Sequence, residues 1–292
     1  METEFEDAAL ILIGHGSTLN GDSSAPIYLH ADAVRKQGQF AEVQECFWKL
    51  EPSISSVCHQ VFSPRVFVVP VFISEGYFTQ QVIPRELGFC LNGEKSFSRV
   101  LSRGEQRFYY CDPIGTHLSM TQALAHRATE VLDQYPFPSR PADTQVSLFI
   151  AGHGTGNNQN SRKIIEDQAA ALRSSGRYAD VHAVFMEENP RIEACYELAS
   201  SRNIVMVPFF ISDGLHSFED IPVMLGESKT TVAKRLREHV PTWRNPTERH
   251  GKRVWYTKSI GLDPAITDVI IERVHEAVSW TENEKMIVNG AR

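Results

Sequence analysis

The sequence predicts an α/β protein made of two tandem flavodoxin-like domains, each a doubly wound parallel sheet. The first observation is a repeat: an apolar run that ends in Gly-His-Gly occurs at residues 9–17 and again at residues 148–155, with His15 matched to His153 at an offset of 138 positions. The second is that short apolar runs alternate with longer amphipathic segments in both halves. Strands that alternate with helices favour right-handed crossovers and parallel sheets.

The join between the two repeats falls near residues 135–145, where the segment YPFPSRPAD is typical of a linker. A chain of 292 residues is also long enough for two domains. We therefore predict an N-terminal domain over residues 1–140 and a C-terminal domain over residues 141–292. A last matching pair of segments, residues 107–115 and 253–261, closes each repeat at a slightly larger offset.

The second repeat shows the expected elements most clearly. Hydrophobic patterning predicts strands over residues 146–151, 180–185, 204–210 and 253–257. It predicts helices over residues 160–173, 190–200, 220–237 and 264–280. The strands are apolar almost throughout, as in a sheet covered by helices on both faces. Residues 91–106 and 244–252 are expected to be surface connections without a motif.

Composition limits the possible functions. The formal charge of -7 disfavours a nucleic-acid partner, which needs a basic face. No apolar run reaches the roughly 20 residues that cross a bilayer, and the acidic N-terminus lacks the features of a signal peptide. Five cysteines without a C-x-x-C pair indicate reduced thiols rather than a disulfide, zinc or iron–sulfur framework. We expect a cytoplasmic protein with no membrane partner, either a monomer or a homo-oligomer.

Three side chains of metal-binding type follow three successive strands of the second repeat. His153 follows the first strand, Glu187 the second and His216 the third. In a flavodoxin-like sheet with strand order 2-1-3, these strand ends are neighbours at the ligand-binding edge. Two imidazoles and a carboxylate suit a divalent transition metal. Taken singly, each has a simpler interpretation as a loop histidine or a surface charge, but the joint placement predicts a metal site that is also catalytic.

The first repeat lacks most of this set. His15 matches His153, but Lys49 stands opposite Glu187 and Phe78 opposite His216. The metal site is therefore predicted in the C-terminal domain, and the N-terminal site is degenerate. Trp48 and Phe78, with the neighbouring Tyr77, suit the wall of a site for a flat apolar ligand. The alternative is that these aromatic side chains only pack an interface between the domains.

The motifs resemble those of the class II tetrapyrrole chelatases, in the two-lobed, CbiX- or CbiK-like form of the sirohydrochlorin cobaltochelatase and ferrochelatase group. The resemblance rests on the Gly-His-Gly-Ser/Thr strand ends, the segment FMEENP (residues 185–190) and the run VPFFISDGLH…DIP (residues 207–222), and it covers most of the chain. It implies two lobes around a cleft in which a divalent metal is inserted into a tetrapyrrole without ATP, in cobalamin or sirohaem biosynthesis.

The resemblance also implies roles for particular residues. His153 and His216 would bind the metal together with an acidic residue, and one histidine would also accept a pyrrole proton. The family often has Phe-x-Glu-x-x-Glu-Pro where this chain has a shorter segment, so the acidic ligand is either Glu187 or Glu188. His15 would be secondary, on the substrate side. No cofactor is expected beyond the metal substrate, which could be Co²⁺, Fe²⁺ or Ni²⁺.

A carboxylate-rich tetrapyrrole needs hydrogen-bond donors. The helix that begins near residue 160 offers backbone N–H groups at its N-terminus, with Asn157, Asn158 and Arg162 close by. The alternative is that Arg162 belongs to a solvated helix face. A hydrolase with an H-G-x-G oxyanion loop would need a G-x-S-x-G motif, which the sequence lacks. The alternative that remains open is a non-catalytic metal or tetrapyrrole binding protein.

Overall fold

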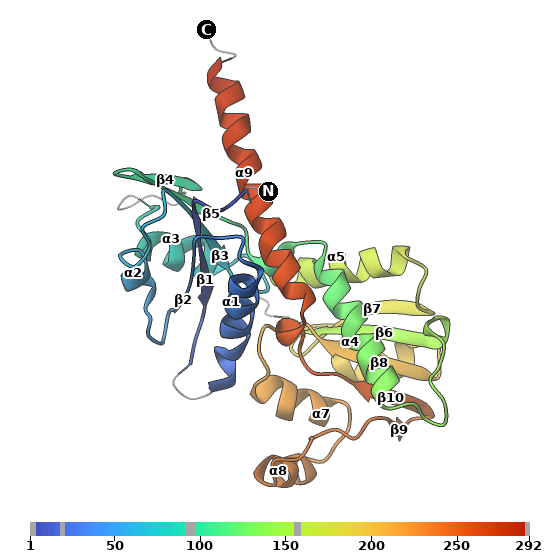
Figure 1. Cartoon of the computed structure of the whole chain (residues 1–292). Helices are drawn as coiled ribbons and strands as arrows, with labels where there is room; N and C mark the ends of the chain where they lie inside the picture. The colour runs from blue at the N-terminus through green and yellow to red at the C-terminus, as the bar shows by residue number, and fades with distance from the viewer. Residues whose placement is uncertain (1–3, 18–20, 91–96, 155–158, 290–292) are drawn as a thin grey trace. The chain divides into compact units, whose positions relative to one another are not determined.

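The computed structural model describes residues 4–17, 21–90, 97–154 and 159–289, with side chains up to residue 280. The chain forms two compact units (Figure 1). Unit 1 comprises residues 1–117 and 264–292, and unit 2 comprises residues 118–263. Each unit is built around one sheet, so the predicted two-domain α/β class is confirmed.

Within the described residues, both sheets have five strands in equivalent orders. In unit 1 the order is β2 (Glu42–Phe47), β1 (Ala8–Gly14), β3 (Arg65–Pro70), β5 (Gln106–Tyr110) and β4 (Val100–Arg103). In unit 2 the order is β7 (Asp180–Phe185), β6 (Val146–Gly152), β8 (Asn203–Pro208), β10 (Lys252–Tyr256) and β9 (Thr247–Arg249). The first four strands of each order are parallel, and the predicted 2-1-3 arrangement is confirmed.

The helices and helical turns pack around these sheets. Unit 1 contains η1 (Gly21–Ser23), α1 (Ala25–Gln37), α2 (Ile54–Val57), the π-helical turn η2 (Phe78–Val82), α3 (Ile83–Glu86), η3 (Ile114–Thr116) and α9 (Ala265–Asn289). Unit 2 contains α4 (Met120–Gln134), η4 (Asp143–Gln145), α5 (Gln159–Ser174), η5 (Ile192–Ala194), α6 (Cys195–Leu198), the π-helical turn η6 (His216–Asp220), α7 (Ile221–Met224), α8 (Lys229–Arg237) and η7 (Ile260–Leu262). The central strands β1 and β6 are buried along their whole lengths, as expected for strands covered on both faces.

Two strands and two helix boundaries differ from the prediction. The segments expected to be surface connections contain β4 and β9, which pair antiparallel with β5 and β10 at the sheet edges. They are short and only partly buried, so they lack the apolar pattern that marks a strand. The helix expected over residues 220–237 is broken into α7 and α8 by Gly226, whose φ of +99° no helix accommodates. The helix expected over residues 190–200 is reduced to η5 and the single turn of α6.

The division into units also differs from the predicted boundary at residues 140 and 141. Helix α4 follows β5 in the chain, yet it contacts β8, β10 and α5 of unit 2 (Figure 1). Helix α9 follows β10, yet it contacts β3 and α1 of unit 1. The last helix of each repeat therefore completes the unit built by the other repeat. Hydrophobic periodicity shows which face of a helix is buried but not which sheet covers it, so the exchange has no local signal.

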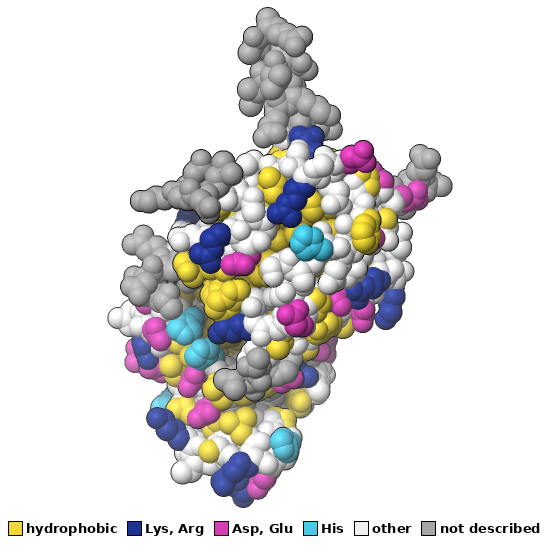
Figure 2. Space-filling model, turned by 90° about the vertical axis from the view of Figure 1, so that its left-hand side faces the viewer, with side chains coloured by type: hydrophobic (Ala, Val, Ile, Leu, Met, Phe, Trp, Pro, Cys, Tyr) yellow, Lys and Arg dark blue, Asp and Glu magenta, His cyan; other side chains and the backbone are white. Residues whose placement is uncertain are grey.

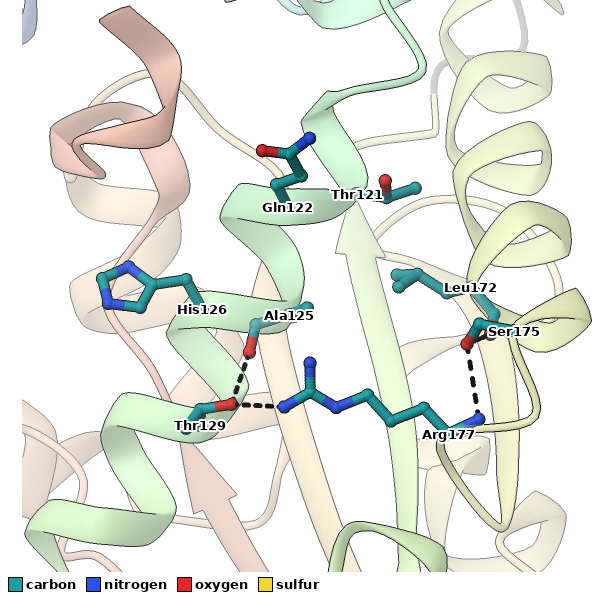
Figure 3. A pocket seen from close by; sticks show the side chains of 8 residues that line it. All are labelled: Thr121, Gln122, Ala125, His126, Thr129, Leu172, Ser175 and Arg177. Atoms are coloured by element: carbon teal, nitrogen blue, oxygen red, sulfur yellow. Dashed lines mark hydrogen bonds between the residues drawn. The ribbon is translucent and has the colours of Figure 1, made fainter. Parts of the chain in front are cut away.

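Polar contacts join α4, and the segment that follows it, to the rest of unit 2. Arg177 donates to Thr129 Oγ1 at 2.8 Å and to Asp143 Oδ2 at 2.6 Å, and Arg140 donates to Asp143 Oδ1 at 2.9 Å. Figure 3 shows the Arg177 side chain extended toward Thr129 along a groove of about 460 Å³ between α4 and α5. Trp255 Nε1 donates to the carbonyl of Tyr135, just after α4, at 2.9 Å.

We expect Asp143→Asn to reduce stability at pH 7 by about 0.5–1 kcal/mol, the range for partly exposed pairs. Burial favours a raised pKa for Asp143, but its hydrogen bonds to Arg177 and Arg140 outweigh this and lower its pKa. The stabilisation is therefore complete above the ordinary Asp pKa of about 3.9 and is lost as pH falls through the lowered value of the folded state. The difference in unfolding free energy between wild type and Asp143→Asn, measured by urea unfolding, should be smaller near pH 3 than at pH 7. Asp167→Asn, at an exposed pair on α5, is the control, and an equal difference at both pH values would contradict the assignment.

Candidate metal site in unit 2

The three predicted ligands follow neighbouring strands at one edge of the unit 2 sheet. Gly152 of β6 pairs with Phe185 of β7, so His153 and Glu187 leave the sheet side by side. The backbone pairing continues past the strands, because the N–H of Glu187 donates to the carbonyl of His153 at 3.1 Å. His216 begins η6, which follows β8. The predicted convergence of strand ends is present in the structure.

The two imidazoles lie close together, with the carboxylate beside them. The ring centroids of His153 and His216 are 4.9 Å apart in an edge-to-face arrangement, and His153 Nδ1 lies 3.8 Å from Glu187 Oε2. His153 Nδ1 is buried and has no hydrogen-bond partner among the residues that the structure describes. The side chains of His153, His216 and Glu187 are 34%, 52% and 59% exposed, so solutes can reach the set. Across the described ranges, no three His, Cys, Asp or Glu side chains are already placed to hold a metal ion together, so these three residues are close neighbours rather than a formed metal-binding group.

The structure distinguishes between the two candidate acidic residues. Glu187 faces His153, whereas Glu188 Oε2 accepts a hydrogen bond from Arg162 Nη1 at 3.3 Å. Arg162 also donates to Glu166 at 2.8 Å and to the carbonyl of Asn189 at 2.9 Å. Of the two candidates, Glu187 is therefore the one beside His153. The guanidinium predicted to bind substrate is paired with acidic neighbours of its own unit.

Two glycines give His153 its place against the sheet. A Cβ at Gly152 would lie 1.9 Å from Ile165 Cδ1, so a larger residue here would force the Ile165 side chain of α5 to shift. Gly154 has a φ of +66°, and a Cβ there would meet Phe185 Cβ at 2.8 Å. The Gly-His-Gly motif thus forms a tight turn that carries the candidate ligand His153.

Hydrogen bonds to Ser217 hold the turn that carries His216. Ser217 Oγ accepts from the N–H of Gly214 at 2.9 Å, and Tyr256 Oη donates to the carbonyl of Ser217 at 2.7 Å. Burial raises the pKa of Tyr256 well above its ordinary value, so the hydroxyl remains a donor at any physiological pH. His216 Nδ1 lies 2.7 Å from Asp220 Oδ2. Sequence reasoning did not single out Asp220, although it begins the Asp-Ile-Pro motif.

The equivalent edge of unit 1 is aromatic. Lys49 occupies the place of Glu187, because its N–H donates to the carbonyl of His15 at 3.0 Å. The His15 ring lies 5.4 Å from Trp48 and 5.0 Å from Phe78, and these two rings are 4.9 Å apart. Tyr77 packs on Phe78 at 5.8 Å and is 60% exposed. We call His15, Trp48, Tyr77 and Phe78 the aromatic cluster of unit 1. His15 is packed among rings rather than beside a second metal ligand.

Asn157 and Asn158 lie outside the described residues. All five cysteines are free thiols, as predicted. Among the helices described, none is long and apolar enough to span a membrane. On the face drawn in Figure 2, acidic, basic and apolar side chains are interspersed, and that face shows no continuous basic area of the kind that binds nucleic-acid phosphates.

Comparisons with known proteins agree on one family. The CbiX family model matches residues 9–131 and again residues 147–277, one match for each repeat. The probable sirohydrochlorin cobaltochelatase of Halobacterium salinarum is 39% identical over 279 residues, covering 92% of this chain and 91% of that protein. The sirohydrochlorin cobaltochelatase of Methanopyrus kandleri is 27% identical over 146 residues, which span 46% of this chain and 97% of the relative.

Solved structures show the same fold. A multi-domain protein of Deinococcus radiodurans, described as structurally similar to chelatases, matches with a TM-score of 0.71 at 30% identity, over 91% of this chain. The match spans about half of that longer protein, 54% of its chain. SirB from Bacillus subtilis, solved with Fe³⁺, matches with a TM-score of 0.66 at 17% identity, over 94% of this chain and 97% of SirB.

Proposed function

Because the chain belongs to the CbiX family, we propose that it inserts a divalent metal, Co²⁺ or Fe²⁺, into sirohydrochlorin or a related tetrapyrrole without ATP. The observation that carries the proposal is the pair of imidazoles in unit 2, 4.9 Å apart, with Glu187 beside them at an exposed sheet edge. Relatives named sirohydrochlorin cobaltochelatases support the choice of macrocycle. The reaction belongs to cobalamin or sirohaem biosynthesis.

The chemistry fits the three side chains. The metal must lose water while two pyrrole N–H protons leave the macrocycle. A neutral imidazole can bind a divalent metal or accept a proton near neutral pH, so two adjacent histidines serve both needs. In the proposed mechanism His153 and His216 bind the metal, one of them takes a pyrrole proton, and Glu187 completes the site. An open coordination shell suits a metal that is passed on rather than retained.

The test is a spectral assay. The protein is mixed with sirohydrochlorin and Co²⁺, and the absorbance change is compared with the protein-free rate. A chelatase accelerates the change at catalytic concentrations. A non-catalytic binding protein of the same fold would bind metal or macrocycle in stoichiometric amounts without acceleration. The reaction is proposed to occur in the cytoplasm, where the free thiols would stay reduced, and to need no cofactor beyond the metal substrate.

The aromatic cluster of unit 1 is proposed to bind the flat macrocycle. Trp48→Ala should raise the KM for sirohydrochlorin about three- to tenfold, since an aromatic contact contributes roughly 0.5–1.5 kcal/mol. The affinity for Co²⁺ alone should stay the same, because the metal site lies in unit 2. Phe62→Ala removes another exposed aromatic side chain of unit 1 and is the matched control. An unchanged KM in Trp48→Ala would leave the cluster without this role.

The residues predicted to donate hydrogen bonds to the substrate carboxylates fall into two groups. Asn157 and Asn158 remain proposed donors to the carboxylates of the macrocycle. Arg162 can take this role only by exchanging Glu166 and Glu188 for the substrate. Measuring sirohydrochlorin affinity in an Arg162→Ala variant distinguishes a substrate contact from a structural ion pair.

A further inference from the structure

We propose that Asp220 is a positioning residue that orients His216 for the metal; the inference rests on the proposed function. Asp220 Oδ2 lies 2.7 Å from His216 Nδ1, within hydrogen-bond distance. If the ring donates from Nδ1, the lone pair on Nε2 is left for the metal. Metal-binding histidines commonly have such a carboxylate partner, which sets the tautomer, holds the ring plane and increases ligand basicity.

The two histidines of the site differ in this respect. Among the described residues His153 Nδ1 has no hydrogen-bond partner, and the glycines on either side of His153 pack closely against Ile165 and Phe185. His216 stands on a turn and its side chain is 52% exposed, so packing alone fixes its ring poorly. The bond to Asp220 provides the missing constraint. It also leaves Nε2 as the nitrogen of His216 that is available to a metal.

Among the described residues, the Asp220 carboxylate contacts His216 and does not cap a helix. Asp220 is the last residue of η6, and its helical backbone runs directly into α7. Its side chain makes no capping bond to that helix. Helix α7 therefore does not require the carboxylate, which is directed to His216 instead.

Unit 1 provides an internal comparison. Its π-helical turn η2 has the same hydrogen bond from the residue after the turn to the first residue of the turn, Ile83 to Phe78, as η6 has from Ile221 to His216. Tyr110 Oη donates to the carbonyl of Thr79 at 2.8 Å, as Tyr256 does to that of Ser217 at 2.7 Å.

The positions that match His216 and Asp220 in this turn are Phe78 and Val82. The same turn thus forms without either polar residue, so neither is needed to build it. Where the histidine is absent, the carboxylate is absent too. If the carboxylate acts only through the histidine, we expect the two residues to be replaced together while the backbone of the turn is retained, as it is in unit 1.

The experiment measures Co²⁺ binding by titration calorimetry without tetrapyrrole, together with the visible spectrum of the bound ion. Asp220→Ala should raise the Kd for Co²⁺ about 10- to 100-fold and change the spectrum. This is the usual effect when a metal-binding histidine loses its carboxylate partner. Asp220→Asn should recover part of the loss, because its amide oxygen accepts the Nδ1–H bond without a negative charge. Asp167→Ala, at an exposed i,i+4 pair on α5, should bind Co²⁺ like wild type.

The double variant H216A/D220A decides whether Asp220 acts through His216. It should bind Co²⁺ no more weakly than His216→Ala alone, because a positioning residue has no effect without its ligand. Losses that multiply in the double variant would overturn the inference. So would wild-type Co²⁺ binding in Asp220→Ala alongside a clear loss in His216→Ala, and this result would leave the proposed function standing. A wild-type protein that binds Co²⁺ but fails to accelerate insertion would instead overturn the proposed function.

Discussion

Replacing His216 by alanine is expected to lower the rate of metal insertion by about 10²–10⁴-fold, the range for loss of a group that transfers a proton in the reaction. The substitution also removes one of the two imidazoles that lie 4.9 Å apart and leaves the metal with His153 and Glu187 only. The initial rate of Co²⁺ insertion into sirohydrochlorin, corrected for the protein-free rate, is the measurement. His216 is half exposed, so the thermal unfolding midpoint should change little.

Two controls separate the site from a general effect of histidine loss. His59→Ala removes an exposed histidine of unit 1 and should retain full activity. His15→Ala should lose far less activity than His216→Ala, because His15 lies among aromatic rings with Lys49, not a carboxylate, beside it. Near wild-type insertion by His216→Ala would remove the metal assignment. Equal losses at His15 and His216 would contradict the proposal that the metal binds in unit 2 alone.

Gly261→Ala is expected to prevent folding of unit 2 or to destabilise it by more than about 4 kcal/mol, the range reserved for severe overpacking. A Cβ at Gly261 would lie 1.5 Å from the carbonyl oxygen of Ile211, a backbone atom that cannot swing away. Ile211 belongs to the segment between β8 and η6, so the substitution would also displace the chain that leads to His216. Gly115 has the same relation to Ile73 O in unit 1, at 2.0 Å.

Soluble expression and denaturant unfolding followed by circular dichroism measure this effect. The matched control is Gly251→Ala, in the turn between β9 and β10, where a Cβ would meet no atom within 4 Å. Its φ of +74° still costs an alanine about 1–2 kcal/mol, so the control should fold with a modest loss. A Gly261→Ala protein as stable as Gly251→Ala would show that the loop at Ile211 can move, contrary to the close packing described.

Local sequence patterns were sufficient for the architecture and for the placement of the three proposed metal ligands at one sheet edge. Apolar runs and the 138-position repeat predicted two parallel sheets in the observed 2-1-3 order. Ligands sit directly after strands, and parallel strands end at a common edge, so the placement of His153, Glu187 and His216 follows from chain order alone. The same reasoning predicted the loss of two ligands from the first repeat.

Only the tertiary structure decided which groups meet through space. It assigned α4 and α9 to the units of the opposite repeats, paired the weak edge strands β4 and β9, and placed Glu187 rather than Glu188 beside His153. It also joined Asp220 to His216 and enclosed His15 in aromatic rings. The physical reason is that sequence periodicity records which face of an element is apolar or polar, whereas the partner of that face depends on the packing of segments far apart in the chain.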